Sequence, residues 1–167
     1  YEDLPKPEAG EDGKINVSTV DEFLAALDSD TTIFLEPGEY NLTAASNYGG
    51  LGGSCYSWEN TYVDGYQLLI RGISNLTIQD TSEDSAGVVS GGGSWTISVD
   101  SDATLTVKSG NIKGWTAVKN CGTVNIEGTA NLEAAAGYGV DCQKDSTVIM
   151  TGGTVDTIGP IRDTADS

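Results

Sequence analysis

Short segments in which hydrophobic and polar residues alternate recur along the second half of the chain. Each copy begins at an aromatic residue, so that starts at Trp95, Trp115 and Tyr138 are separated by 20 and then 23 residues. At one place, each copy has a threonine followed by an aliphatic residue: Thr104-Leu105, Thr123-Val124 and Thr147-Val148. A short period of strand fragments predicts a solenoid, in which each unit buries its hydrophobic side against the next.

The period is close to the length of one coil of a right-handed parallel β-helix, which contributes three short strands per turn. Leucine-rich repeats have a similar period, but their Leu-x-x-Leu-x-Leu frame is missing. The Asp-Gly pairs typical of hairpin turns lie outside the repeat. We therefore predict an all-β fold, a right-handed parallel β-helix of about five coils.

One amphipathic helix is predicted over residues 19–28. Val20, Phe23, Leu24 and Leu27 fall on one face at the spacing of an α-helix, and Thr19-x-x-Glu22 is a capping box. A solenoid needs its terminal hydrophobic stripe covered, so we expect this helix to cap the N-terminal end.

A strand-like segment follows over residues 32–42, and it fits the template of residues 105–112. The fit matches four pairs: Ile33 with Leu105, Leu35 with Val107, Gly38 with Gly110, and Tyr40 with Ile112.

The helix sequence Val-Asp-Glu-Phe-Leu-Ala-Ala-Leu, followed by Thr-Ile-Phe-Leu-Glu-Pro-Gly-Glu-Tyr, resembles the entry to pectate-lyase-like right-handed β-helix proteins. Residues 69–79 also resemble the strand, asparagine turn and strand of that superfamily. The resemblance covers residues 17–155 and implies the fold. It does not imply one function, since the fold carries lyases, hydrolases, epimerases, adhesins and binding proteins.

Domain limits follow from composition. Residues 1–14 are predicted to be an acidic linker rich in Pro and Gly, residues 15–158 a single β-helix domain, and residues 159–167 a polar tail. Two stretches interrupt the repeat: a long loop over residues 44–66 and a shorter excursion over residues 81–94. Insertions in a solenoid often emerge on its binding face.

Aromatic residues are the first candidate site, because flat side chains stack on the C–H faces of sugars. The long loop contains Tyr48, Tyr56, Trp58, Tyr62 and Tyr66, which would form either a carbohydrate platform or a local mini-core. The repeated Trp95, Trp115 and Tyr138 would stack in one column. By alternation they share a side with Ile97, Ala117 and Val140, which favours an internal or corner stack; if exposed, the column is a polysaccharide-binding ladder.

The net charge of the chain limits the classes of partner that we expect. The chain has 25 acidic and 8 basic residues and a formal net charge of −17, which argues against nucleic acid and anionic lipid. No hydrophobic run has the roughly 20 residues of a membrane helix. Exposed carboxylates offer a weak Ca²⁺ hypothesis, for which the candidate ligands are Asp80, Glu83, Asp84, Asp100 and Asp102. No cofactor is otherwise indicated.

Cys121 and Cys142 are 21 residues apart, about one repeat, so adjacent coils would bring them near each other. They would form either a disulfide in an oxidising compartment or two buried thiols. Cys55 would then be left over.

Catalysis is not indicated by the motifs. The Trp-x-Asp-His and Arg-x-Pro-x-Arg patterns of pectate lyases are absent, and so are Asp-Asp pairs and all histidines. We predict a secreted or cell-surface module, bacterial in character, that binds polysaccharide or a surface glycan and is not an enzyme. The alternatives are a pectate-lyase-like enzyme acting on acidic polysaccharide and a structural spacer of a larger surface protein.

Overall fold

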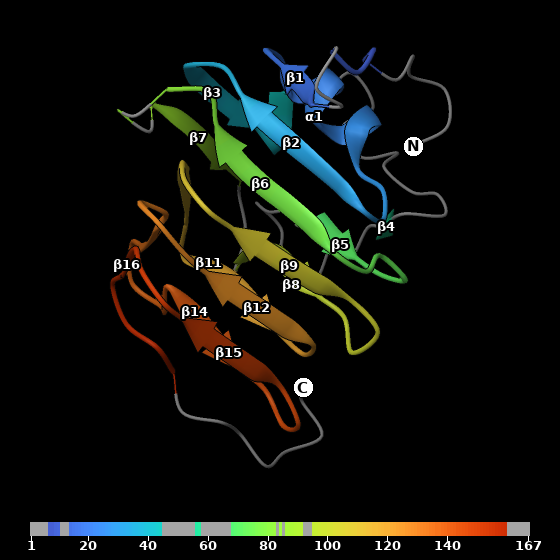
Figure 1. Cartoon of the computed structure of the whole chain (residues 1–167). Helices are drawn as coiled ribbons and strands as arrows, with labels where there is room; N and C mark the ends of the chain where they lie inside the picture. Colours follow the sequence, from blue (N-terminus) through green and yellow to red (C-terminus); the bar gives the residue numbers. More distant parts are fainter. Residues whose placement is uncertain are drawn as a thin grey trace.

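The structure is a computed structural model that describes residues 7–10, 14–44, 56–57, 68–82, 84, 86–91 and 95–159. The described chain is mostly β-structure with one short α-helix, and its strands form three sheets, which we call A, B and C. Figure 1 shows the strands of sheet A stacked from the N-terminal cap to the C-terminal end. This arrangement is consistent with a parallel β-helix, as the repeat predicts.

The three sheets are built from strands that recur in turn along the chain. Sheet A contains β1 (Ile15–Val17), β2 (Thr31–Leu35), β6 (Leu76–Asp80), β9 (Thr104–Val107), β12 (Thr123–Ile126) and β15 (Thr147–Met150). Sheet B contains β3 (Gly38–Asn41), β7 (Gly87–Ser90), β10 (Asn111–Gly114), β13 (Asn131–Ala134) and β16 (Thr154–Val155). Sheet C contains β4 (Tyr56–Ser57), β5 (Leu68–Ile70), β8 (Trp95–Val99), β11 (Thr116–Asn120) and β14 (Val140–Cys142). All pairs are parallel except β4 with β5.

The predicted register of sheet A is confirmed in the second half of the chain. Val124 of β12 pairs with Leu105 of β9 on one side and with Val148 of β15 on the other. The threonines beside them, Thr104, Thr123 and Thr147, pair in the same way. Each aliphatic residue therefore lies over the equivalent residue of the strand before it.

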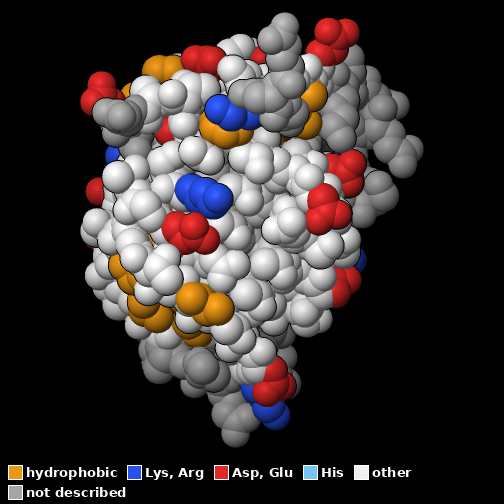
Figure 2. Space-filling model, in the orientation of Figure 1, with side chains coloured by type: hydrophobic (Ala, Val, Ile, Leu, Met, Phe, Trp, Pro, Cys, Tyr) orange, Lys and Arg blue, Asp and Glu red, His pale blue; other side chains and the backbone are white. Residues whose placement is uncertain are grey.

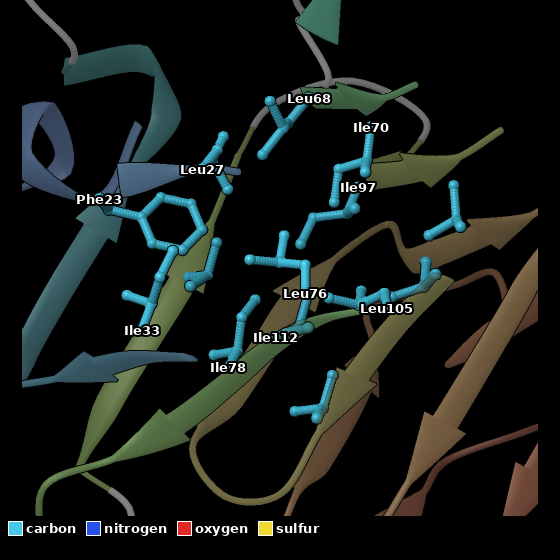
Figure 3. Packing of buried hydrophobic residues seen from close by; sticks show 14 of the residues in the cluster. Phe23, Leu27, Ile33, Leu68, Ile70, Leu76, Ile78, Ile97, Leu105 and Ile112 are labelled. Carbon is cyan, nitrogen blue, oxygen red and sulfur yellow. The ribbon is translucent and has the colours of Figure 1, made fainter. Parts of the chain in front are cut away.

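The core is a stripe of aliphatic side chains enclosed by the three sheets. Leu105, Ile112 and Ile97, one from each sheet, are fully buried. Figure 3 shows such side chains converging on the interior from all three sheets and from the helix. In β7 and β12 buried positions alternate with less buried ones, as the period of two in a β-strand requires.

Helix α1 (Val20–Ala26) covers the N-terminal end of this stripe. The four residues predicted to form its hydrophobic face are all buried. The side chain of Thr19 accepts a hydrogen bond from the Glu22 amide (3.1 Å), and the Glu22 carboxylate accepts from the Ser18 amide (2.9 Å). The capping box is thus confirmed, although the bond of the Glu22 carboxylate goes to the amide of Ser18, one residue before the N-cap Thr19. A 3₁₀ turn, η1 (Leu42–Ala44), follows β3.

The asparagine turn before β6 is also present. Asn75 has a positive φ of 61°, in the left-handed region that asparagine tolerates. Its side chain donates to Asp30 Oδ1 at the equivalent turn before β2 (3.1 Å).

Two segments differ from the sequence-based prediction. The excursion predicted over residues 81–94 contains β7, which pairs with both β3 and β10. Within the predicted linker, Ala9 forms an antiparallel bridge with Ile15, and the Gly10 amide donates to the Lys14 carbonyl (2.8 Å). Part of that segment therefore folds back on β1.

The C-terminal end of the stripe is less covered than the N-terminal end. Met150 of β15 lies over Ile126 of β12, yet Met150 is 43% exposed and Ile126 is fully buried. Within the described part of the chain, no helix is long and apolar enough to cross a membrane.

Candidate functional site

A shallow hollow of about 620 Å³ lies on sheet B, on the side facing away from the core. Its lining comes from β3, β7, β10 and β13, four consecutive strands of the sheet. The charged and hydroxyl groups of the lining are Glu39, Ser90, Lys113 and Glu133, and the apolar side chains are Val88, Ala134 and Ala135. Its volume lies within the roughly 300–1,000 Å³ of small-ligand sites.

Strand alternation explains why polar groups collect on this face. Tyr40, Val89, Ile112 and Leu132 pair across sheet B and point into the core. The neighbours of these residues in each strand must point outward.

The charges in the hollow are partly paired. Lys113 and Glu133 are cross-strand partners, and the Lys113 ammonium lies 3.1 Å from Glu133 Oε2, with both side chains about half exposed. The Ser90 hydroxyl donates to Glu39 Oε1 (2.8 Å). Two carboxylates and one ammonium give the lining a formal net charge of −1.

Trp115 adjoins the hollow. It follows the lining residue Gly114 directly and is 58% exposed. The neighbouring main chain is held by Ala135, whose amide donates to the Gly114 carbonyl, and by Gly137, whose amide donates to the Trp115 carbonyl, both at 2.8 Å. The lining is therefore followed directly in the chain by an exposed indole. Aromatic rings and carboxylates together suit sugars, which offer C–H faces and hydroxyl groups.

The predicted column of Trp95, Trp115 and Tyr138 is wrong at its middle member. Trp95 pairs with Thr116, and the Tyr138 amide donates to Thr116 Oγ1 (3.1 Å), so Thr116 occupies the position assigned to Trp115. Likewise Ile97 pairs with Val118 and not with Ala117. The strand β11 therefore reaches this position one residue later than the repeat of aromatic residues implies.

The other two aromatic residues are half-buried. The Lys119 ammonium lies 4.3 Å from the centre of the Trp95 ring, so a cation–π contact covers part of that indole. Trp115 is thus the most exposed of the three aromatic residues of the predicted column.

The predicted loop platform lies almost wholly outside the described residues, which exclude Tyr48, Trp58, Tyr62 and Tyr66. Of Tyr56 only the main chain is described, in β4.

The predicted calcium ligands are not brought together. Asp80 is buried and accepts hydrogen bonds from the Gly87 amide (2.6 Å) and from Ser82. Asp100 pairs with Arg71 (2.7 Å). This bond, with a smaller effect of the Ser101 amide, lowers the pKa of Asp100, although partial burial acts in the opposite direction. Asp102 accepts from the Gly72 amide (2.8 Å). Asp84 is exposed, and Glu83 lies outside the described residues.

Among the residues that the structure describes, no group of three or more His, Cys, Asp or Glu side chains could hold a metal ion. The described carboxylates of the calcium hypothesis are mostly used in turns, as aspartate commonly is.

The predicted disulfide between Cys121 and Cys142 is absent. Both residues belong to the described part of the chain, and they are not bonded to each other. Asn120, not Cys121, pairs with Cys142, so the two cysteines are one position out of register. Cys142 faces the core, where burial, and secondarily the nearby Asp141 charge, raises the pKa of its thiol. Cys55 lies outside the described residues.

Comparison of the chain with models of known protein families, with curated proteins and with solved structures gives no match. The site therefore rests on its own geometry.

The sequence analysis did not identify Glu39, Lys113 or Glu133 as site residues. A signal for them was present, since each directly adjoins a residue of the core-facing row in sheet B. The missing step was the alignment of β3 with β10 and β13, which depends on finding β7 between them.

Proposed function

We propose that the chain is a right-handed parallel β-helix of about five coils that binds carbohydrate without transforming it, in a secreted or cell-surface setting. The observation that carries the proposal is the hollow on sheet B beside the exposed Trp115. An aromatic face next to fixed hydrogen-bonding groups is what recognition of a sugar ring requires, because the ring has apolar faces and a polar edge.

The size and position of the hollow support an oligosaccharide as ligand. The lining spans four strands, and three strand spacings amount to about 14 Å along the stack.

The enzymatic alternative receives less support from this hollow. Glu39 and Glu133 stand on β3 and β13, the first and last of the four strands, about 14 Å apart at the main chain by strand spacing. Glycosidase carboxylates lie about 5–9.5 Å apart. Lys113, the one basic group of the described lining, is paired with Glu133. A net negative lining also disfavours the uronates that a pectate-lyase-like enzyme would bind.

The test is a glycan array followed by calorimetry on the wild type and Trp115→Ala. Removing a stacked indole should weaken binding by about 1 kcal/mol, which is roughly five- to tenfold. Ile149→Ala is the matched control, because Ile149 is 51% exposed and stands on sheet A.

Equal binding by Trp115→Ala and the wild type would contradict the proposal, and so would a wild type that binds no glycan. The second result would leave the spacer as the remaining reading of the fold.

A further inference from the structure

We infer, building on the proposed function, that the hollow on sheet B selects saccharides carrying a free amine, of the glucosamine type. The feature that points to this ligand is Glu39, a carboxylate in the hollow whose charge is not neutralised by a cation among the described residues.

Glu39 and Glu133 differ in whether a cation lies next to the carboxylate. Glu133 is balanced by Lys113 at 3.1 Å. Glu39 is exposed at the other end of the lining, two strands from Lys113. An ammonium group bound at Glu39 would meet one full negative charge. Lys113, the cation of the hollow, is paired with Glu133 and does not neutralise that charge.

Ser90 orients the Glu39 carboxylate. Its hydroxyl donates to Oε1 (2.8 Å) from the adjacent strand β7. Among the described groups no donor contacts Oε2, so this oxygen is available to a ligand. A charge-assisted hydrogen bond from N–H to a carboxylate is about twice as strong as a neutral one. A carboxylate that is already held in position loses less entropy when that bond forms.

The rest of the lining suits a sugar better than a bare metal ion. Calcium takes about six to eight oxygen ligands, whereas the described part of the chain offers no cluster of three acidic side chains. Val88, Ala134 and Ala135 give the hollow an apolar component, and the exposed Trp115 follows the lining residue Gly114 in the chain. A pyranose ring with an amine satisfies both the apolar surface and the single charge.

The whole molecule favours the same ligand. Its formal net charge of −17 attracts cationic chains and repels uronates. Acidic side chains are spread over the face of the molecule drawn in Figure 2. That general attraction would act anywhere on the surface, so an experiment must separate it from the effect of Glu39.

The experiment compares four oligosaccharides of equal length by calorimetry: glucosamine, N-acetylglucosamine, glucose and galacturonate oligomers. Measurements are made at about pH 5.5, above the ordinary glutamate pKa of about 4.3 and where the sugar amine is protonated. The wild type should bind the glucosamine oligomer about tenfold more tightly than the N-acetylated one. Glu39→Gln should abolish that preference and keep the weaker binding of the uncharged oligomers.

Glu127→Gln is the matched control. It changes the net charge by the same amount, and Glu127 immediately follows β12 of sheet A, away from the hollow. This variant should keep the preference for the amine, and raising the salt concentration should reduce that preference in the wild type.

Three results would overturn the inference. These are equal affinity for the amine and N-acetyl forms, a preference that survives Glu39→Gln, and an equal loss in Glu127→Gln. If uncharged oligomers still bind in a Trp115-dependent manner, the proposed function stands and only the amine selectivity fails. If no oligomer binds, both fail.

Discussion

The hydroxyl group of Tyr40 donates a hydrogen bond to the main-chain oxygen of Val17, 2.8 Å away and 23 residues earlier in the chain. The same hydroxyl contacts the Glu36 carbonyl at 2.6 Å. The Tyr40 ring is 1% exposed and lies 6.2 Å from the ring of Phe23 in α1. One side chain therefore joins β3, the end of β1 and the cap.

Tyr40→Phe should lower the free energy of unfolding by about 1–2 kcal/mol at neutral pH, because it removes a buried donor whose one proton serves the two carbonyl oxygens. Burial, with smaller contributions from the charges of Glu36 and Asp80, raises the pKa of Tyr40 to about 12 from an ordinary value of 10.0. Since the pKa is higher in the folded state, the stabilisation is complete below about pH 10 and disappears as the pH rises toward about 12.

Urea unfolding of the wild type and Tyr40→Phe from about pH 7 to about pH 12 measures this effect. The difference between them should narrow above about pH 10. A difference that stays constant across that range would contradict the assignment.

Position along the stack should decide what a core substitution costs. Ile126 and Met150 occupy the same column on neighbouring strands, but only Ile126 is fully buried. Ile126→Ala should lower the free energy of unfolding by about 2–5 kcal/mol, and Met150→Ala by less than about 1 kcal/mol. Chemical denaturation of both variants provides the comparison. Equal losses would mean that the last strand is covered as well as the strand before it.

Gly114 lies against the side chain of Thr96. A Cβ at position 114 would overlap Thr96 Oγ1 and come within 3.0 Å of the Thr116 carbonyl oxygen. Gly114→Ala should therefore destabilise the fold by about 1–3 kcal/mol. At Gly91 the nearest atom to an added Cβ is the mobile Cδ1 of Leu42, at 3.3 Å, so Gly91→Ala should cost less.

Thr96→Ala tests the origin of that cost by a double-mutant cycle. The substitution removes the overlapping oxygen, which in the wild type donates to the Lys113 carbonyl (2.7 Å). Gly114→Ala should therefore be less destabilising in the Thr96→Ala background. Additive effects in thermal unfolding would show that Thr96 is not the source of the strain.

Asp80 should stabilise the fold independently of calcium. Its carboxylate accepts from the Gly87 amide and from Ser82, and an amide side chain cannot satisfy all of these donors. Asp80→Asn should lower the free energy of unfolding by about 1–3 kcal/mol, whereas Asp84→Asn, at an exposed turn, should have little effect.

Melting curves with added Ca²⁺ and with EDTA complete this comparison. The Asp80→Asn difference should be the same in both. A melting temperature of the wild type that rises with Ca²⁺ and no longer does so in Asp80→Asn would revive the metal hypothesis.

Local patterns in the sequence predicted the parts of the fold in which strand lengths repeat. The face of α1 follows from helical spacing, and the column of Thr104, Thr123 and Thr147 follows from equal distances between strands of sheet A. Tyr40 was matched with Ile112, and both pair with Val89 of β7, so the match found the right row of sheet B without the strand between them. These predictions hold because a one-residue slip in a strand would turn its hydrophobic side outward.

Corners between sheets were harder to predict, because their lengths vary. Trp115 was assigned to the column that Thr116 occupies, because the corner before β11 extends one residue further than the aromatic repeat implies. Ile33 was matched with Leu105, but it pairs with Ile78, which pairs with Val107. That two-residue shift keeps the same face buried, so hydrophobicity cannot detect it. The hollow depends on residues brought together across such corners, and the sequence pattern alone did not identify it.

The matching of strand to strand in sheet A makes the length of this protein adjustable in whole turns. Residues 104–122 contribute one strand to each sheet, and Thr123 pairs directly with Thr104. Removing those 19 positions, or inserting a second copy of them, would join main chain to main chain at an equivalent point. The number of coils can then evolve by duplication of a single module, while the capping helix and the outer face of sheet B are selected separately.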